Sequence, residues 1–107
     1  MLPQPISIAD AIQQITQSWS PVELARVNDQ VVRIALFEGE YHWHVHENED
    51  ELFLVHEGEI TIQMKGESDL VLKAGEIGIV PKGVEHCPKS VGKSYVLMFE
   101  PFALDKK

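Results

Sequence analysis

Most histidines of this chain are clustered in one short stretch. Four of the five histidines lie between positions 42 and 56, and three of them, His42, His44 and His46, alternate strictly. Because successive side chains of an extended strand point to opposite faces, this alternation places the three imidazoles on one face. Imidazole is a common ligand of transition metals, so the pattern predicts a metal site. The alternative is a polar sheet face that holds no metal.

A carboxylate follows the histidines at a spacing that suits the same site. If the four residues 47–50 form a hairpin loop, His46 pairs with Glu51 and His44 with Phe53. Directly paired residues project on one face with Cβ atoms roughly 5 Å apart. This assumed register predicts Glu51 as a ligand, with the loop carboxylates solvated.

A fourth ligand is harder to predict from the residues alone. His86 follows the sequence Pro81-Lys82-Gly83, a turn that could bring a following strand back across a barrel. An isolated histidine is more often an ordinary surface or core residue than a ligand. Cys87 alternates with His86, so we expect it to point away from the site and to pack.

Short strands must position these residues. Ser7 as an N-cap and Ile8, Ala11, Ile12 and Ile15 at helical spacing predict an amphipathic helix over residues 7–17. After it, short apolar stretches separated by turn residues indicate an all-β sandwich or barrel. The predicted strands are 22–27, 30–38, 41–46, 51–56, 60–65, 70–73, 77–80 and 95–99.

Length and charge narrow the classes of function. The 107 residues fit one domain, 1–107, and no apolar run is long enough to cross a bilayer. A formal charge of -8 would repel phosphate backbones, so we expect no nucleic-acid partner. With no basic, apolar leader and a single cysteine, the chain fits a cytoplasmic location.

The two histidine regions resemble the two motifs of the cupin superfamily. In the first, His44-Val45-His46 is followed after four residues by Glu51 and after six more by Gly58. In the second, the family spacing is matched in order by Gly75, Pro81, Gly83 and His86. The sequence departs from the family pattern at two places: four residues instead of five separate Gly39 from His44, and Ser90 stands where Asn is frequent.

This resemblance implies a cupin fold, a double-stranded β-helix or jelly-roll barrel with its core over residues 30–100. It assigns His44, His46, Glu51 and His86 as ligands of one divalent transition metal. Three imidazoles and one carboxylate suit Fe, Mn, Zn, Ni or Co. Leu52, Leu54 and Trp43 would form a second apolar face, and small cupins commonly pair, so we expect a homodimer.

Two classes of function remain open at this point. The first is a metal-dependent enzyme, resembling cupin dioxygenases or isomerases, that acts on a small anionic metabolite, with His42 as a candidate base. The second is a non-catalytic module that binds a sugar or another metabolite, or acts as a sensor, with the metal structural. A storage protein is a weaker third reading.

Overall fold

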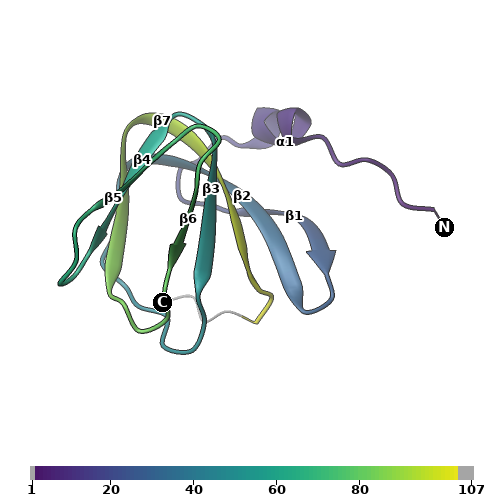
Figure 1. Ribbon diagram of the computed structural model, residues 1–107. Helices are drawn as coiled ribbons and strands as arrows, with labels where there is room; N and C mark the ends of the chain where they lie inside the picture. The colour runs from purple at the N-terminus through teal and green to yellow at the C-terminus, as the bar shows by residue number, and fades with distance from the viewer. Residues whose placement is uncertain (1, 104–107) are drawn as a thin grey trace.

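The computed structural model describes residues 2–103, which form one short helix and seven strands. The helix, α1, spans Ile8–Gln14, and Figure 1 shows it beside the strands at the end of an extended N-terminal arm. The strands are β1 (Val22–Val27), β2 (Gln30–Glu40), β3 (Glu51–Glu57), β4 (Glu59–Met64), β5 (Leu70–Lys73), β6 (Ile77–Val80) and β7 (His86–Pro101).

The strands pair antiparallel in the order β1-β2-β7-β3-β6, while β4 pairs with both β5 and β7. Strand β7 is central to this arrangement because it changes partners along its 16 residues. Its first part, from His86 to Lys89, pairs with β4, and its last part pairs with β2 and β3. Strand β7 therefore joins the pair β4 and β5 to the strands β1, β2, β3 and β6 of the barrel in Figure 1.

The core lies inside the barrel and follows from the alternation of side chains along the strands. On β3, Phe53 and Val55 are buried, and on β7, Val96 and Met98 are buried opposite them. Aliphatic side chains of β4, β5 and β6, among them Ile60, complete one apolar cluster. Val80 of this cluster pairs with Glu51, so the cluster borders the predicted metal ligands.

Several predicted elements are confirmed. The bounds of β1, β5 and β6 are those predicted, and β2, β3 and β4 differ from the predictions by one or two residues at their ends. Ser7 is the N-cap of α1, because its Oγ accepts a hydrogen bond from the Asp10 amide at 3.1 Å. The helix is shorter than predicted, since Ile15 already has extended backbone angles.

The predicted strand over residues 41–46 is wrong. In this stretch only His44 forms a β-bridge, with His86, and the two residues exchange backbone hydrogen bonds of 3.0 and 2.9 Å. Alternation describes an extended chain, but a ladder also requires a neighbouring strand along its whole length. The histidine segment is therefore an extended loop that is attached to β7 through Tyr41 and His44 and forms no continuous ladder with it.

The strand predicted over residues 95–99 is too short, because β7 begins at His86. Pro88 has no amide hydrogen to donate, but its carbonyl accepts a hydrogen bond from the Tyr41 amide at 3.0 Å, and the residue pairs with Ile62. The proline is thus accommodated within the ladder.

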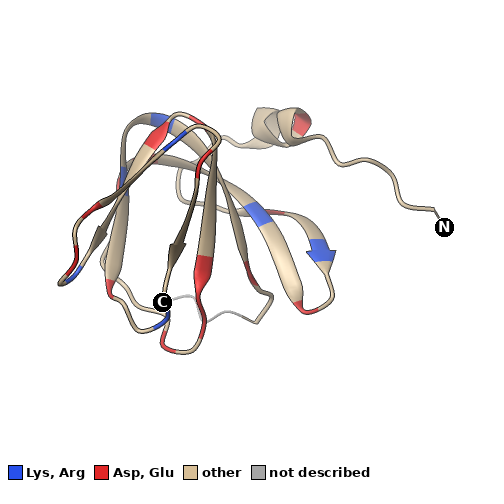
Figure 2. Cartoon of the chain, in the orientation of Figure 1, with Lys and Arg blue, Asp and Glu red and all other residues tan. Residues whose placement is uncertain are grey.

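Charged residues are distributed along residues 2–103. Figure 2 shows Asp and Glu spread over loops and strand ends on several sides of the barrel. Among the residues described, no helix is long and apolar enough to cross a membrane.

Candidate metal centre

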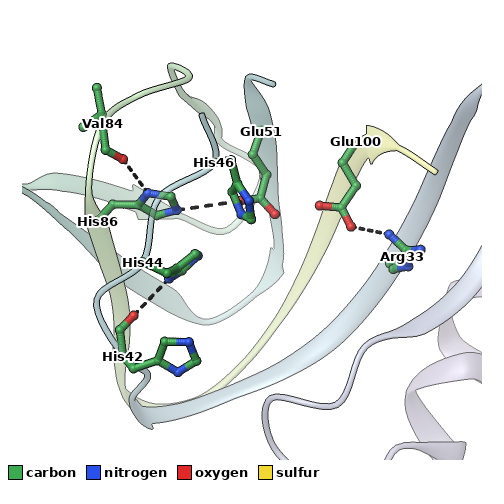
Figure 3. A network of polar contacts seen from close by, with 8 residues as sticks. All are labelled: Arg33, His42, His44, His46, Glu51, Val84, His86 and Glu100. Atoms are coloured by element: carbon green, nitrogen blue, oxygen red, sulfur yellow. Dashed lines mark hydrogen bonds and ion pairs between the residues drawn. The ribbon is translucent and has the colours of Figure 1, made fainter. Parts of the chain in front are cut away.

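Four predicted ligands come together at one end of the barrel. His44 and His46 lie on the extended loop before β3, Glu51 is the first residue of β3, and His86 is the first residue of β7. One ligand atom from each residue lies within 4.8 Å of the others. Figure 3 shows the three imidazole rings grouped together with the Glu51 carboxylate beside His46. A cluster of this size and composition could hold one metal ion.

Backbone carbonyls orient two of the imidazoles. His44 Nδ1 lies 3.0 Å from the carbonyl oxygen of His42, and His86 Nδ1 lies 2.9 Å from that of Val84 (Figure 3). Since a carbonyl only accepts hydrogen bonds, each Nδ1 must carry the proton. Each Nε2 then presents its lone pair to the centre of the cluster, which is the arrangement typical of metal-binding histidines.

The cluster contains buried polar atoms that lack hydrogen-bond partners. Glu51 Oε1 and His86 Nε2 are fully buried, and neither has such a partner within residues 2–103. Their separation is 3.7 Å, and Glu51 Oε1 lies 3.5 Å from His46 Nε2. Burying such atoms without partners is costly, and a cation at the centre would satisfy both. The residues present therefore fit a metal ion.

The protonation states also suit a cation. Burial lowers the pKa of His44, and the charges of His86 and His46 lower it further. Burial raises the pKa of Glu51, but polar contacts with His46 and His86 outweigh this effect and hold the pKa well below its usual range. A neutral imidazole and an ionised carboxylate are the forms that bind metal.

The hairpin register that predicted Glu51 is wrong, although Glu51 does lie in the cluster. Glu51 pairs with Val80, and Phe53 pairs with Gly78 and Met98. The loop is instead held by the turn before β7.

Two hydrogen bonds make that attachment. The Gly83 amide donates to the His46 carbonyl and the Lys82 amide donates to the Asp50 carboxylate, each over 2.8 Å. Asp50 is exposed, but it is a hydrogen-bond acceptor rather than simply a solvated loop residue. These contacts place the loop and the start of β7, and hence His46 and His86, next to each other.

His42 lies outside the cluster. Its ring is exposed and lies over Tyr41, with 3.8 Å between ring centroids, while its carbonyl orients His44. Cys87 is buried beside Glu40, as its predicted packing role requires, and burial raises the pKa of its thiol. Trp43 is 46% exposed in the single chain. Its place on an apolar face that a second copy covers stays a prediction.

A cavity of about 130 Å³ adjoins the cluster, and it contains residues that the sequence analysis missed. His44, His46 and Glu51 form part of its wall. Most of the remaining wall is apolar and comes from the segment before β1, from β2, β3 and β7, with Glu100 as an additional carboxylate. The wall of this cavity is therefore assembled from segments far apart in the chain.

Glu100 and Arg33 form a buried ion pair next to the cluster, as Figure 3 shows. Burial raises the pKa of Glu100 to about 7, and the neighbouring Glu51 carboxylate adds to this effect while Arg33 opposes it. The sequence does contain a signal for the burial of Glu100, because Glu100 alternates with Met98 and Val96 and so lies on the same buried face of β7. It could not be used because the inward face of β7 was not known from the sequence.

Two comparisons decide the family. A model of the cupin domain matches residues 30–102. The uncharacterized protein YdbB of Bacillus subtilis (strain 168) is 39% identical over 95 residues, which cover 89% of this chain and 81% of YdbB. The chain belongs to the cupin family.

A solved cupin confirms the predicted fold. The crystal structure of a cupin-2 domain containing protein from Shewanella frigidimarina NCIMB 400 matches with a TM-score of 0.86 and 36% identity. The match covers 90% of this chain and 93% of that one. The chain is thus an all-β cupin with one short N-terminal helix.

More distant cupins include hydroquinone 1,2-dioxygenases. The enzyme of Sphingomonas sp. TTNP3, solved with 4-hydroxybenzoate bound, is 15% identical with a TM-score of 0.74, and the match covers 80% of this chain and 67% of that chain. PnpCD, solved with Fe3+, is 16% identical with a TM-score of 0.80. The match covers 91% of this chain and 32% of that chain. Such low identities show a shared fold alone.

Proposed function

We propose that this cupin is a metal-dependent enzyme that acts on a small anionic metabolite, with His44, His46, Glu51 and His86 as the metal ligands. The observation that carries the proposal is the pair of buried atoms, Glu51 Oε1 and His86 Nε2, that have no hydrogen-bond partner among the described residues. The ligand set suits iron, manganese, zinc, nickel or cobalt. The fold shared with a dioxygenase solved with Fe3+ supports iron as the first metal to test.

Charge supports an anionic substrate. One ionised carboxylate and three neutral imidazoles offset only one of the two charges of a divalent ion, so the centre retains a net positive charge. When bound, such an ion supplies Lewis acidity or activates dioxygen. The chain itself orients two of the imidazoles through backbone carbonyls and lines most of the adjoining cavity with apolar side chains.

The candidate base His42 is less well supported. Its ring is not among the residues that line the cavity. We retain it as a residue to test, since its carbonyl orients His44 and its ring lies 5.4 Å from that of His44 between centroids.

The test is elemental analysis of the untagged protein, with His86→Ala and His56→Ala prepared in parallel. His56 is exposed and lies outside the cluster, so it is the matched control. We expect about one transition metal ion per chain in the parent and in His56→Ala, and loss of that ion in His86→Ala. The absence of metal from all three proteins would refute the proposal.

The metal found directs the second step. Iron or manganese leads to oxygen-consumption assays with small anionic substrates, and zinc, nickel or cobalt leads to isomerase assays. Bound metal with tight metabolite binding but no turnover in either assay would favour the non-catalytic module instead.

A further inference from the structure

The cavity beside the metal centre has an aromatic wall, which consists of Trp19, Phe37, Tyr41 and Phe53. Trp19 is the central ring of this wall. Its ring centroid lies 4.4 Å from that of Phe37 and 4.8 Å from that of Tyr41, and Phe37 meets Phe53 edge-on at 6.3 Å. The wall therefore presents π-systems from four parts of the chain, the segment before β1, β2, the histidine segment and β3, to one small space.

The backbone of Trp19 is strained. Its φ is 60°, in the left-handed region, where a bulky side chain is rarely found. Two hydrogen bonds hold it there: its amide donates to the Leu36 carbonyl at 2.8 Å, and its indole N–H donates to the Glu38 carbonyl at 2.9 Å. Backbone strain that the surroundings maintain in this way is concentrated at binding sites.

The cavity is about the size of one six-membered ring. Its volume of about 130 Å³ compares with roughly 150 Å³ for an engineered apolar cavity that binds benzene. The polar groups that line it, His44, His46, Glu51 and Glu100, include three of the four proposed metal ligands. A ligand with an apolar ring against the wall and an anionic group toward the proposed metal ligands would match this lining.

We propose that the substrate class is a planar, single-ring aromatic anion, and that Trp19 is the specificity-determining residue that selects the planar ring. This inference rests on the proposed function, because the anionic group is directed to the metal centre. Aromatic rings prefer offset-stacked or edge-to-face contacts with other rings, and a saturated ring of equal size is thicker and lacks the π-system. The wall thus favours benzoate over cyclohexanecarboxylate, although the two anions carry the same charged group.

The experiment measures the binding of these two anions to the metal-loaded protein by calorimetry. We compare the parent with Trp19→Leu, which keeps an apolar side chain but removes the aromatic ring, and with Trp19→Phe, which restores a ring. Trp43→Phe is the control because Trp43 is the other tryptophan of the chain and does not line the cavity. In that control, Trp19 is the only tryptophan left, so quenching of its fluorescence reports a ligand at the wall.

We expect benzoate to bind the parent about tenfold more tightly than cyclohexanecarboxylate, and Trp19→Leu to lose about tenfold in affinity for benzoate alone. Trp19→Phe should recover most of this loss, and benzoate should quench the fluorescence of Trp43→Phe. Equal affinity of the parent for both anions, or unchanged benzoate binding in Trp19→Leu, would overturn the inference.

The metal content of the same samples separates this failure from that of the proposed function. A parent protein without metal refutes the metal-dependent enzyme. A parent that holds metal but does not prefer benzoate refutes only the aromatic substrate class. Metal content and circular dichroism of Trp19→Leu equal to those of the parent exclude misfolding as the cause of weakened binding.

Discussion

At the scale of single residues, the buried pair of Arg33 and Glu100 shows how the site depends on charges outside the proposed ligand set. Both side chains face the barrel interior, with 10% and 4% of their surfaces exposed, and Glu100 adjoins Glu51. A buried charge is tolerated only while its partner remains, because desolvation penalises an isolated ion. Arg33 thus stabilises a second carboxylate next to the one proposed to bind metal.

We predict that Arg33→Met lowers the free energy of unfolding by about 1–3 kcal/mol, because Glu100 loses its buried partner. The loss stays below that of an isolated buried charge, since the pKa of Glu100 already lies at about 7 and the carboxyl takes up a proton when Arg33 is removed. Urea denaturation followed by circular dichroism measures the loss. The control is Lys65→Met, whose ion pair with Glu85 is largely exposed and should contribute no more than about 1 kcal/mol. Equal losses in the two variants would contradict the role assigned to Arg33.

At the scale of elements, β7 connects the proposed metal ligands to the rest of the barrel. It begins at His86, carries Glu100 near its end, and bends between Ser90 and Ser94, where its pairing with β2 is also interrupted. The bend is held by short contacts: the Glu59 amide donates to Ser94 Oγ at 3.1 Å, and Ser90 Oγ donates to the Gly92 carbonyl at 2.6 Å. Gly58, between β3 and β4, lies directly against this bend.

We predict that Gly58→Ala is strongly destabilising. A Cβ at this position would lie 2.2 Å from Ser94 Oγ and 2.9 Å from Ser94 Cα, and the φ of +96° is unfavourable for any other residue. The left-handed backbone costs about 1–2 kcal/mol, and the overlap adds about 1–3 kcal/mol. Thermal and urea unfolding measure the change in the free energy of unfolding.

Gly66→Ala is the matched control for that substitution. Its φ of +80° is similar, but a Cβ there would meet nothing within 4 Å. It should therefore lose only the backbone contribution, about 1–2 kcal/mol. A loss in Gly58→Ala no greater than that in Gly66→Ala would show that the bend of β7 can move aside.

At the scale of the whole molecule, the outer face of the sheet bears on the expected homodimer. Cross-strand pairs place Leu52 and Leu54 of β3 on one face with Ile77 and Ile79 of β6 and with Phe99 of β7. Ile77, Ile79 and Phe99 are exposed by 58%, 53% and 39%. Exposed apolar side chains gathered on one face are typical of an interaction surface, and a two-fold dimer buries the same face of both subunits.

We predict that the protein is a dimer in solution and that Ile79→Glu converts it to a monomer. A charge in this face would have to be buried without a partner when two copies meet. Light scattering at micromolar concentration gives the mass, and Val71→Glu, an exposed apolar position on β5, is the control. A parent protein that is monomeric at this concentration would contradict the prediction.

The residues of the proposed metal site could be predicted because their signal is local. His44, His46 and Glu51 lie within one short segment, and the spacing of Gly75, Pro81, Gly83 and His86 resembles a second known motif. Strands β1, β5 and β6 could be predicted because apolar residues and turn residues delimit them along the chain. These features need little information about distant residues, so the sequence by itself determined them.

Only the tertiary structure decided how the histidine loop is held and what surrounds it. Strand pairing depends on packing between residues distant in sequence, and periodicity does not encode it. For that reason the hairpin register was wrong and the partners of β7 were not foreseen. Trp19, Glu100 and three of the proposed metal ligands meet at one cavity only after the barrel closes, so the cavity became visible only in three dimensions.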